Sequence, residues 1–294
     1  MTGLRGQWQF DEPLSRHTSW RVGGPARRLY RPADADDLTE FMRRLDPDEP
    51  LLWLGLGSNL LVDDAGFPGT VILTQGTLDR LERQGDNSLY AQAGVSSAKL
   101  ARFAARHDLT GIEFLAGIPG TLGGALAMNA GAWGGETWRF VRRVWTLDRQ
   151  GQVRKRDSAE YEPAYREVRG PAGEWFLAAE LGLIPGDGAA SLARIRALLD
   201  RRAATQPVGQ SSCGSVFRNP PGDHAARLID SLGLKGSRIG GAEVSEKHAN
   251  FIVNRGAATA TDIVRLIEHI QETVERHTGI HLVPEVRRVA GENV

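Results

Sequence analysis

Glycine is the residue that most constrains how this chain can fold. The 294-residue sequence contains 35 glycines, about 12% of the chain, and no Gly-X-Y period. A usual share of glycine is about 7%. Glycine adopts left-handed and other special backbone conformations at little cost. The enrichment therefore predicts many tight turns, and places where a ligand or a second stretch of backbone comes close.

Two glycine segments stand out. Gly55, Gly57, Ser58 and Asn59 follow the apolar run 51–54, and a nearly uncharged glycine-rich stretch runs over 111–135. The first segment lacks the third glycine and the following helix of a Rossmann fingerprint, and the chain has no Walker A loop. The second is too rich in glycine for a good helix and too short for a membrane span, so we expect a ligand-contacting loop. Together they favour a dinucleotide whose pyrophosphate lies against backbone.

Composition excludes several classes of protein. Lys plus Arg and Asp plus Glu both number 36, so the chain lacks the basic footprint of a nucleic-acid-binding protein. Cys213 is the only cysteine, which rules out an internal disulfide and a zinc site built on paired cysteines. No signal-peptide pattern, membrane-length apolar run or His-Glu-x-x-His spacing is present. We expect a soluble cytoplasmic protein without a metal, a nucleic-acid partner or a membrane partner.

Hydrophobic periodicity predicts alternating helices and strands. We expect helices over 34–45, 96–107, 190–204, 223–232 and 261–278, and strands over 51–54, 71–73, 89–93, 141–147, 152–156 and 175–184. This alternation indicates an α+β protein. Pro185 and Gly186 suggest a boundary near residue 187, which gives an N-terminal domain over 1–187, in parts 1–75 and 76–187, and a C-terminal domain over 188–294.

Several motifs in order resemble one family. They are HTSWRVGGPA (17–26), GLGSNLL (55–61), GIPGTLGG (117–124), Asn129 to Gly131, Tyr161 with Tyr165 and Arg166, GSVFRNP (214–220), GGAEVSEKHANFIVN (240–254) and PEVR (284–287). Over nearly the whole chain, this set is similar to the UDP-N-acetylenolpyruvoylglucosamine reductases. Little chain separates Arg166 from Ser215, so the resemblance is to the shorter subtype.

The resemblance implies a fold, cofactors and a reaction. The fold is a two-part FAD-binding domain of the vanillyl-alcohol-oxidase type, followed by a smaller α+β substrate-binding domain. A hydride passes from NADPH through non-covalent FAD to UDP-N-acetylglucosamine enolpyruvate, and UDP-N-acetylmuramate is formed for peptidoglycan synthesis. The residues implied to bind FAD are Gly55, Leu56, Gly57, Ser58, Asn59, Gly117, Ile118, Pro119, Gly120, Thr121, Gly123, Gly124, Asn129, Ala130 and Gly131.

The implied catalytic residues suit this chemistry. Hydride addition to the β-carbon of the enol ether leaves negative charge on the α-carbon and carboxylate, so the site needs a cation and an acid. By resemblance, Arg166 stabilises that charge, Ser215 donates the proton, and Glu285 acts as an acid or an orienting partner. The implied substrate contacts, suited to a carboxylate and a diphosphate, are Tyr165, Arg218, Asn219, Lys247 and Arg287.

Other interpretations stay open at this point. Without the motifs, Arg166 is an ordinary surface arginine, Ser215 a turn serine, and Glu285 a strand residue paired with a neighbouring arginine. The chain as a whole is also compatible with another FAD oxidoreductase of the same fold or with a binding module that has no turnover. A serine hydrolase fits poorly, because Phe217 stands where the Gly-x-Ser-x-Gly elbow needs glycine. We expect Cys213 to be an inert small hydrophobic residue.

Overall fold

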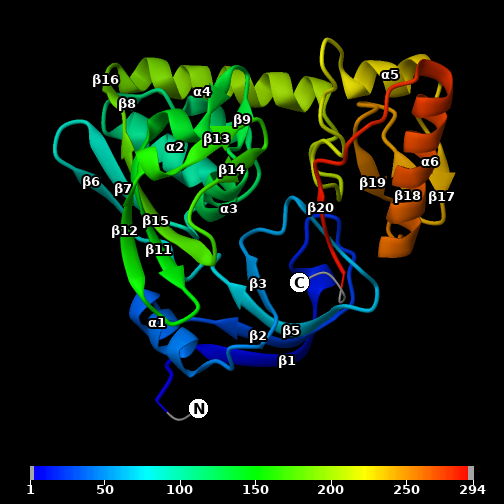
Figure 1. Ribbon diagram of the computed structural model, residues 1–294. Helices are drawn as coiled ribbons and strands as arrows, with labels where there is room; N and C mark the ends of the chain where they lie inside the picture. The colour runs from blue at the N-terminus through cyan, green and yellow to red at the C-terminus, as the bar shows by residue number, and fades with distance from the viewer. Residues whose placement is uncertain (1–2, 291–294) are drawn as a thin grey trace. The chain divides into compact units, whose positions relative to one another are not determined.

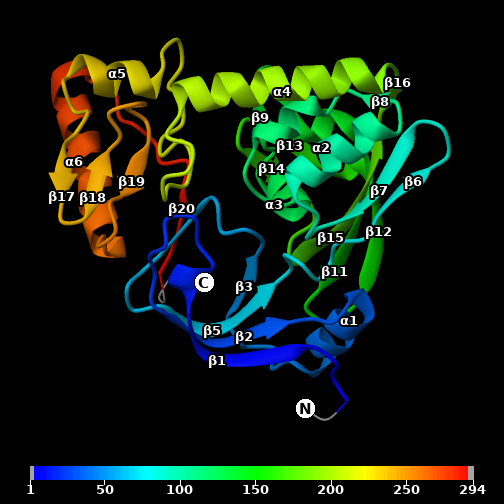
Figure 2. The same cartoon turned by 180° about the vertical axis from the view of Figure 1, so that it is seen from behind.

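The chain forms two compact units, neither of which is a continuous stretch of sequence. A computed structural model describes residues 3–290 (Figures 1 and 2). Unit 1 takes the described residues up to Gln9, then Leu29–Leu56 and Val71–Arg201; unit 2 takes Phe10–Arg28, Gly57–Thr70 and the residues from Arg202 onward. This division follows contacts in space and differs from the linear domain boundaries expected at residues 75 and 187, which stay a prediction.

The first sheet has four strands and one helix, and three of its strands include residues assigned to each unit. The sheet has the order β1-β2-β5-β3. Its helix α1 begins after Asp34, whose side chain accepts a hydrogen bond from the Asp37 N–H at 2.9 Å, and Phe41 stacks on Tyr30 in the core. The bounds are β1 (Gln7–Pro13), β2 (Pro25–Arg31), α1 (Ala35–Arg44), β3 (Leu51–Leu54) and β5 (Phe67–Leu73).

A five-stranded antiparallel sheet lies wholly within unit 1, in the order β12-β11-β15-β7-β6. Helix α2 begins after Ser96, whose hydroxyl accepts from the Lys99 N–H, and it packs its apolar face into the same core. The bounds of its strands and of the helix are β6 (Leu81–Gln84), β7 (Ser88–Gln92), α2 (Ser97–Arg106), β11 (Val141–Asp148), β12 (Val153–Asp157) and β15 (Glu174–Gly182). Three separate two-stranded pairs are β8 (Leu109–Thr110) with β16 (Ile184–Pro185), β9 (Gly131–Ala132) with β10 (Gly135–Glu136), and β13 (Glu162–Ala164) with β14 (Glu167–Arg169).

The glycine-rich stretch 111–135 is more regular than the expected loop. It contains the 3₁₀ helix η2 (Glu113–Gly117) and the short helix α3 (Leu122–Ala127). Leu122 and Leu126 are fully buried in the core of unit 1. Burial of these side chains outweighs the poor helix propensity of Gly123 and Gly124, so the prediction of an irregular loop here was wrong.

The long helix α4 (Gly188–Thr205) packs on unit 1 along its first part. Ile195 is buried in the second core of unit 1, and the Ser191 hydroxyl donates to the Glu113 carboxylate at 2.8 Å. This helix was expected to open the C-terminal domain. Leu192 and Leu199 are partly buried against the same core, which also contains side chains of α2 and η2.

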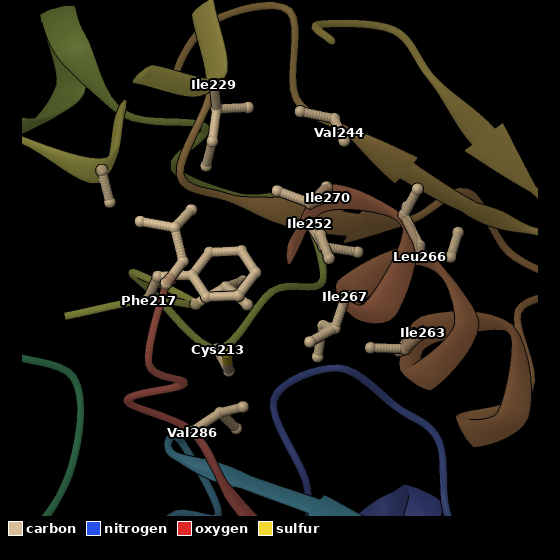
Figure 3. Close-up of a cluster of buried hydrophobic side chains, with 14 of the residues drawn as sticks. Cys213, Phe217, Ile229, Val244, Ile252, Ile263, Leu266, Ile267, Ile270 and Val286 are labelled. Atoms are coloured by element: carbon tan, nitrogen blue, oxygen red, sulfur yellow. The ribbon is translucent and has the colours of Figure 1, made fainter. Parts of the chain in front are cut away.

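Unit 2 has one hydrophobic core between a small sheet and a long helix (Figure 3). Ile263, Leu266 and Ile270 of α6 pack against the sheet β17-β18-β19. A separate parallel pair joins β4 to β20, with Leu60 opposite Arg287. The bounds are η1 (Leu14–Arg16), β4 (Leu60–Val62), α5 (Ala225–Ser231), β17 (Arg238–Ile239), β18 (Ala242–Val244), β19 (Ile252–Asn254), α6 (Ala260–Thr278) and β20 (Arg287–Val289).

The five expected helices are confirmed, with ends shifted by up to two residues. The helix α6 shows why its ends were readable: Thr259 and Asp262 form a capping box at the start, and Gly279 ends the helix with a φ of 71°. The expected strands are confirmed as well, except that the last one breaks after Gly182. Within residues 3–290 no helix combines the length and apolar character needed to cross a membrane.

Candidate active site

The two glycine segments meet within unit 1. A Cβ atom placed on Gly55 would lie 2.3 Å from the Thr121 Oγ1, so only glycine allows this approach. Thr121 is itself buried and precedes α3. A Cβ on Gly124 would meet nothing within 4 Å, and this glycine is exposed. The backbone here is bare and accessible, and that fits a cofactor that lies against it.

Asn129 joins the second glycine segment to the hairpin that carries the expected catalytic arginine. Its amide nitrogen donates to the Ala164 carbonyl at 3.1 Å and to Glu136 at 3.3 Å, and its side-chain oxygen accepts from the Trp138 N–H at 3.1 Å. The residue is 2% exposed and has a φ of 44°. Because both ends of the amide are engaged, we expect any contact of Asn129 with the cofactor to come from its backbone.

Arg166 lies at the tip of a two-residue hairpin in unit 1. Ala164 pairs with Glu167, and so Tyr165 and Arg166 form the turn between β13 and β14. Arg166 has a φ of 58°, a left-handed conformation that glycine or asparagine usually occupies. Its guanidinium donates to the Gly131 carbonyl at 3.0 Å and lies over the Tyr165 ring. A strained non-glycine residue at such a position points to function.

In unit 2 the first glycine segment contacts the segment that carries Glu285. Gly57 has a φ of 62°, and a Cβ there would lie 2.1 Å from the His17 carbonyl oxygen. Two residues on, the Asn59 amide donates to the Glu285 carbonyl at 3.1 Å, while the Asn59 carbonyl accepts from the Arg287 N–H at 3.0 Å. The structure therefore places a predicted cofactor residue directly beside the predicted acid.

Ser215 and Glu285 are also brought together in unit 2. The segments that carry them pair as short antiparallel strands, with Phe217 opposite Pro284. The Glu285 N–H donates to the Val216 carbonyl at 2.7 Å, and the Arg218 N–H donates to the Val283 carbonyl at 2.9 Å. In this pairing the half-buried Glu285 lies opposite Val216, the residue that follows Ser215. Arg166 belongs to unit 1.

The expected substrate contacts have different surroundings. Within the described residues the Arg218 Nε is buried without a hydrogen-bond partner, as expected for a donor that awaits an anion. By contrast, the Asn219 side-chain oxygen accepts from the Ala225 N–H at the start of α5. The Lys247 ammonium donates to the Ala203 carbonyl, and Tyr165 and Arg287 are exposed.

The electrostatics of this region keep Cys213 protonated. Burial raises the pKa of the Cys213 thiol well above its ordinary value, and the charge of Glu285 adds to the increase. The thiol lies among the apolar side chains of Phe217 and Val286 (Figure 3). Burial also lowers the pKa of His248, helped by the positive charge of Lys235. The structure supports the expectation of an inert thiol.

Sequence reasoning missed one residue of this arrangement. Asn250 bonds the backbone of Phe217 through its side chain and that of Val216 through its carbonyl. It lies within the quoted motif GGAEVSEKHANFIVN, and that membership was the only signal in the sequence. No spacing rule connects residues 217 and 250.

Comparisons with known proteins place the chain in a family. Residues 206–289 match the family model of the UDP-N-acetylenolpyruvoylglucosamine reductase C-terminal domain, and residues 26–156 match that of an FAD binding domain. The UDP-N-acetylenolpyruvoylglucosamine reductase of Methylococcus capsulatus is 61% identical over 288 residues, which cover 98% of this chain and 94% of that protein. The protein of the same name from Alkalilimnicola ehrlichii is 60% identical, over 98% of this chain and 96% of its own.

The chain belongs to the UDP-N-acetylenolpyruvoylglucosamine reductase family. A crystal structure of such a reductase from Thermus caldophilus matches with a TM-score of 0.84 and 34% identity, covering 97% of this chain and 99% of that one. The predicted family, the α+β fold with its FAD-binding domain, the oxidoreductase class, and FAD with NADPH as co-substrate are confirmed by this membership.

Proposed function

We propose that the chain reduces the enolpyruvyl group of UDP-N-acetylglucosamine enolpyruvate to give UDP-N-acetylmuramate. The observation that carries the assignment of roles is the pairing of the Ser215 segment with the Glu285 segment, beside Asn59 of a glycine segment. The reaction is then a cytoplasmic step of peptidoglycan synthesis that serves cell shape and division. Its partners are small molecules, the UDP-amino sugar and NADPH, rather than nucleic acid or membrane.

Bound FAD supplies the hydride carrier between NADPH and the substrate. Addition of hydride to the β-carbon breaks the carbon–carbon π bond and leaves an electron pair on the α-carbon, conjugated with the carboxylate. In our proposal, Ser215 donates its hydroxyl proton to that carbon and regains a proton from solvent, while Glu285 is the second acidic group of the site. Arg166 neutralises the developing charge, because its planar guanidinium binds a carboxylate with two donors.

We further propose that Tyr165, Arg218, Asn219, Lys247 and Arg287 bind the carboxylate and diphosphate of the substrate. The buried Arg218 Nε supports its assignment, because a desolvated donor gains most from an anionic partner. We also propose residues 1–187 as the FAD-binding domain and 188–294 as the substrate-binding domain. Each of the two family models falls inside one of these ranges.

Stepwise spectroscopy of the flavin tests the proposed reaction. The purified protein is loaded with FAD and treated anaerobically with NADPH, and UDP-N-acetylglucosamine enolpyruvate is then added. We expect NADPH to bleach the visible flavin absorption and the substrate to restore it. If NADPH bleaches the flavin and this substrate fails to restore the colour, the chain is another FAD oxidoreductase. A protein that takes up no FAD overturns the proposal altogether.

The variant Ser215→Ala tests the proton donor. We expect bleaching by NADPH to keep its rate, and the return of colour with substrate to slow by about 10²- to 10⁴-fold, the range typical of lost general acid catalysis. Ser212→Ala, outside the GSVFRNP motif, is the matched control and leaves both steps unchanged. An unaltered return of colour in Ser215→Ala removes the serine from this role.

A further inference from the structure

The Asn250 side chain hydrogen-bonds the edge of the Ser215 segment that faces away from the Glu285 segment. In the short antiparallel pair of 216–218 with 283–285, the hydrogen bonds run between Val216 and Glu285 and between Arg218 and Val283. A ladder of this kind points the N–H and C=O of the residue between them, here Phe217, toward its other edge. The Asn250 side chain meets both groups, accepting from the Phe217 N–H at 3.0 Å and donating to the Phe217 carbonyl at 2.8 Å.

The asparagine is itself held firmly. It is 4% exposed, its N–H donates to the His248 Nδ1 at 3.3 Å, and its carbonyl accepts from the Val216 N–H at 2.9 Å. One side chain thus takes the place of a neighbouring strand. With the Glu285 contact included, the peptides that follow Ser215 are bonded on both edges.

The chain before Ser215 supplies little constraint. Gly214 has a φ of 84°, and a Cβ placed there would meet nothing within 4 Å. Because glycine rotates freely, the position of the Ser215 hydroxyl must be set from the side of Val216 and Phe217. On that side, Asn250 supplies three of the hydrogen bonds.

We propose that Asn250 is a positioning residue, which fixes the Ser215 hydroxyl relative to Glu285 for proton transfer to the substrate. The inference rests on the proposed role of Ser215. Misplacement of a reacting group by about 1 Å can cost about 10²-fold in rate. Loss of the hydrogen bonds from Asn250 should therefore slow the proton-dependent step. Hydride transfer from NADPH, in which Ser215 has no part, should keep its rate.

The variant Asn250→Asp separates the two halves of the reaction. It keeps the acceptor for the Phe217 N–H and, when ionised, loses the donor to the Phe217 carbonyl. We expect the return of flavin colour with substrate to slow by about 10- to 100-fold, with bleaching by NADPH within about twofold of the parent. Equal slowing of both steps, or of neither, overturns the proposal.

Asn254→Asp is the matched control. Asn254 also binds backbone with both ends of its amide, donating to the Trp20 carbonyl at 2.9 Å and accepting from the Gly256 N–H at 2.7 Å. None of these groups belongs to the Ser215 or Glu285 segments. The control carries the same chemical change in the same unit, and we expect it to leave both half-reactions within about twofold of the parent.

The pH profile supplies a readout that a general loss of stability does not. Burial raises the pKa of an introduced carboxyl group, and its protonated form restores the donor to the Phe217 carbonyl. The return of colour in Asn250→Asp should approach the parent rate at low pH and fall as the pH rises. The ionisable side chains nearby, His248, Glu285, Lys235, Asp230 and Cys213, are the same in the parent and in Asn254→Asp, so comparison with these two proteins isolates the new carboxyl group.

Two further variants keep the proposal testable. If Asn250→Asp does not fold, Asn250→Ser introduces no charge, and we expect it to show the same selective slowing. In Ser215→Ala the Asn250→Asp change should add almost no further slowing, because both act on one proton transfer. Slowing by Ser215→Ala without slowing by either Asn250 variant overturns the inference alone, whereas no effect of Ser215→Ala overturns the role of Ser215 itself.

Discussion

Single residues near the proposed proton donor carry out different tasks although they lie close together. Asn59 and Asn250 hold backbone, Arg218 keeps a buried donor without a partner, and Cys213 fills apolar space. Only the surroundings of each side chain separate these roles. The cysteine illustrates this best, because a thiol beside a proposed flavin site is reactive or inert according to its pKa and exposure.

The Cys213 thiol should react slowly in the folded protein. Its pKa is raised by burial and by Glu285, so at pH 8 the thiolate fraction is small, and each unit of increase lowers that fraction about tenfold. We expect a thiol reagent to label the native protein more than about tenfold more slowly than the urea-unfolded chain, which supplies the control for one reactive thiol. Rapid labelling of the native protein would contradict the buried position.

At the scale of elements, the hairpin of β13 and β14 holds Arg166 in a conformation that costs free energy. The left-handed conformation costs a non-glycine residue about 1–2 kcal/mol, and the hydrogen bond to the Gly131 carbonyl returns part of it. Strand β13 is exposed, and Val168 of β14 packs against the core, but neither contact requires arginine at the tip of the hairpin. We attribute the residue to the chemistry of the guanidinium.

Substitution of Arg166 should therefore separate stability from activity. In Arg166→Gly, relief of strain offsets the lost hydrogen bond, and we expect the free energy of unfolding to change by less than about 1 kcal/mol. In Arg166→Lys the charge remains and the planar two-donor group is lost, so we expect the return of flavin colour with substrate to slow about tenfold or more.

Arg169→Lys on the same hairpin is the control, since Arg169 forms an exposed ion pair with Glu167. We expect its kinetics to match the parent. Urea unfolding and anaerobic stopped-flow absorbance measure the two quantities. If Arg166→Lys turns over at the parent rate, the arginine serves the fold alone.

At the scale of the whole molecule, each unit carries a buried carboxylate paired with arginines. Hydrogen bonding from Arg156 lowers the pKa of Glu174 in unit 1, and that from Arg255 lowers the pKa of Glu243 in unit 2. A carboxylate with a lowered pKa in the folded state adds stability above its ordinary pKa of about 4.3 and loses it as the pH falls through the lowered value. Both units should therefore lose stability in acid.

Urea unfolding as a function of pH tests this expectation. We expect the free energy of unfolding to be nearly constant from about pH 6 to 7 and to fall below about pH 5. Glu243→Gln should lose about 1–3 kcal/mol at neutral pH and show a shallower fall in acid. Glu82→Gln, which alters an exposed pair with Arg80, should follow the parent curve. A Glu243→Gln curve parallel to that of the parent would refute the contribution of Glu243.

The amino-acid sequence by itself determined the helices, most strands, and the family with its cofactor. Apolar periodicity and caps such as Ser96 and Gly279 act over a few neighbouring residues, so they are legible without the fold. The ordered motifs, from GLGSNLL to PEVR, carried the site residues by resemblance. Within that set, local sequence could not separate Ser215 or Glu285 from ordinary turn and strand residues.

Only the tertiary structure decided which residues hold the site in place. The helix α3 forms in a glycine-rich stretch because Leu122 and Leu126 are buried, and α4 packs its first turns on unit 1. The hydrogen bonds of the Asn250 side chain to Phe217 join positions 33 residues apart in the sequence. The hydrogen bond from Asn59 to Glu285 joins positions 226 residues apart. Such bonds depend on how the chain packs in three dimensions, because the partners of a buried amide are chosen by proximity in space and leave no period in the sequence.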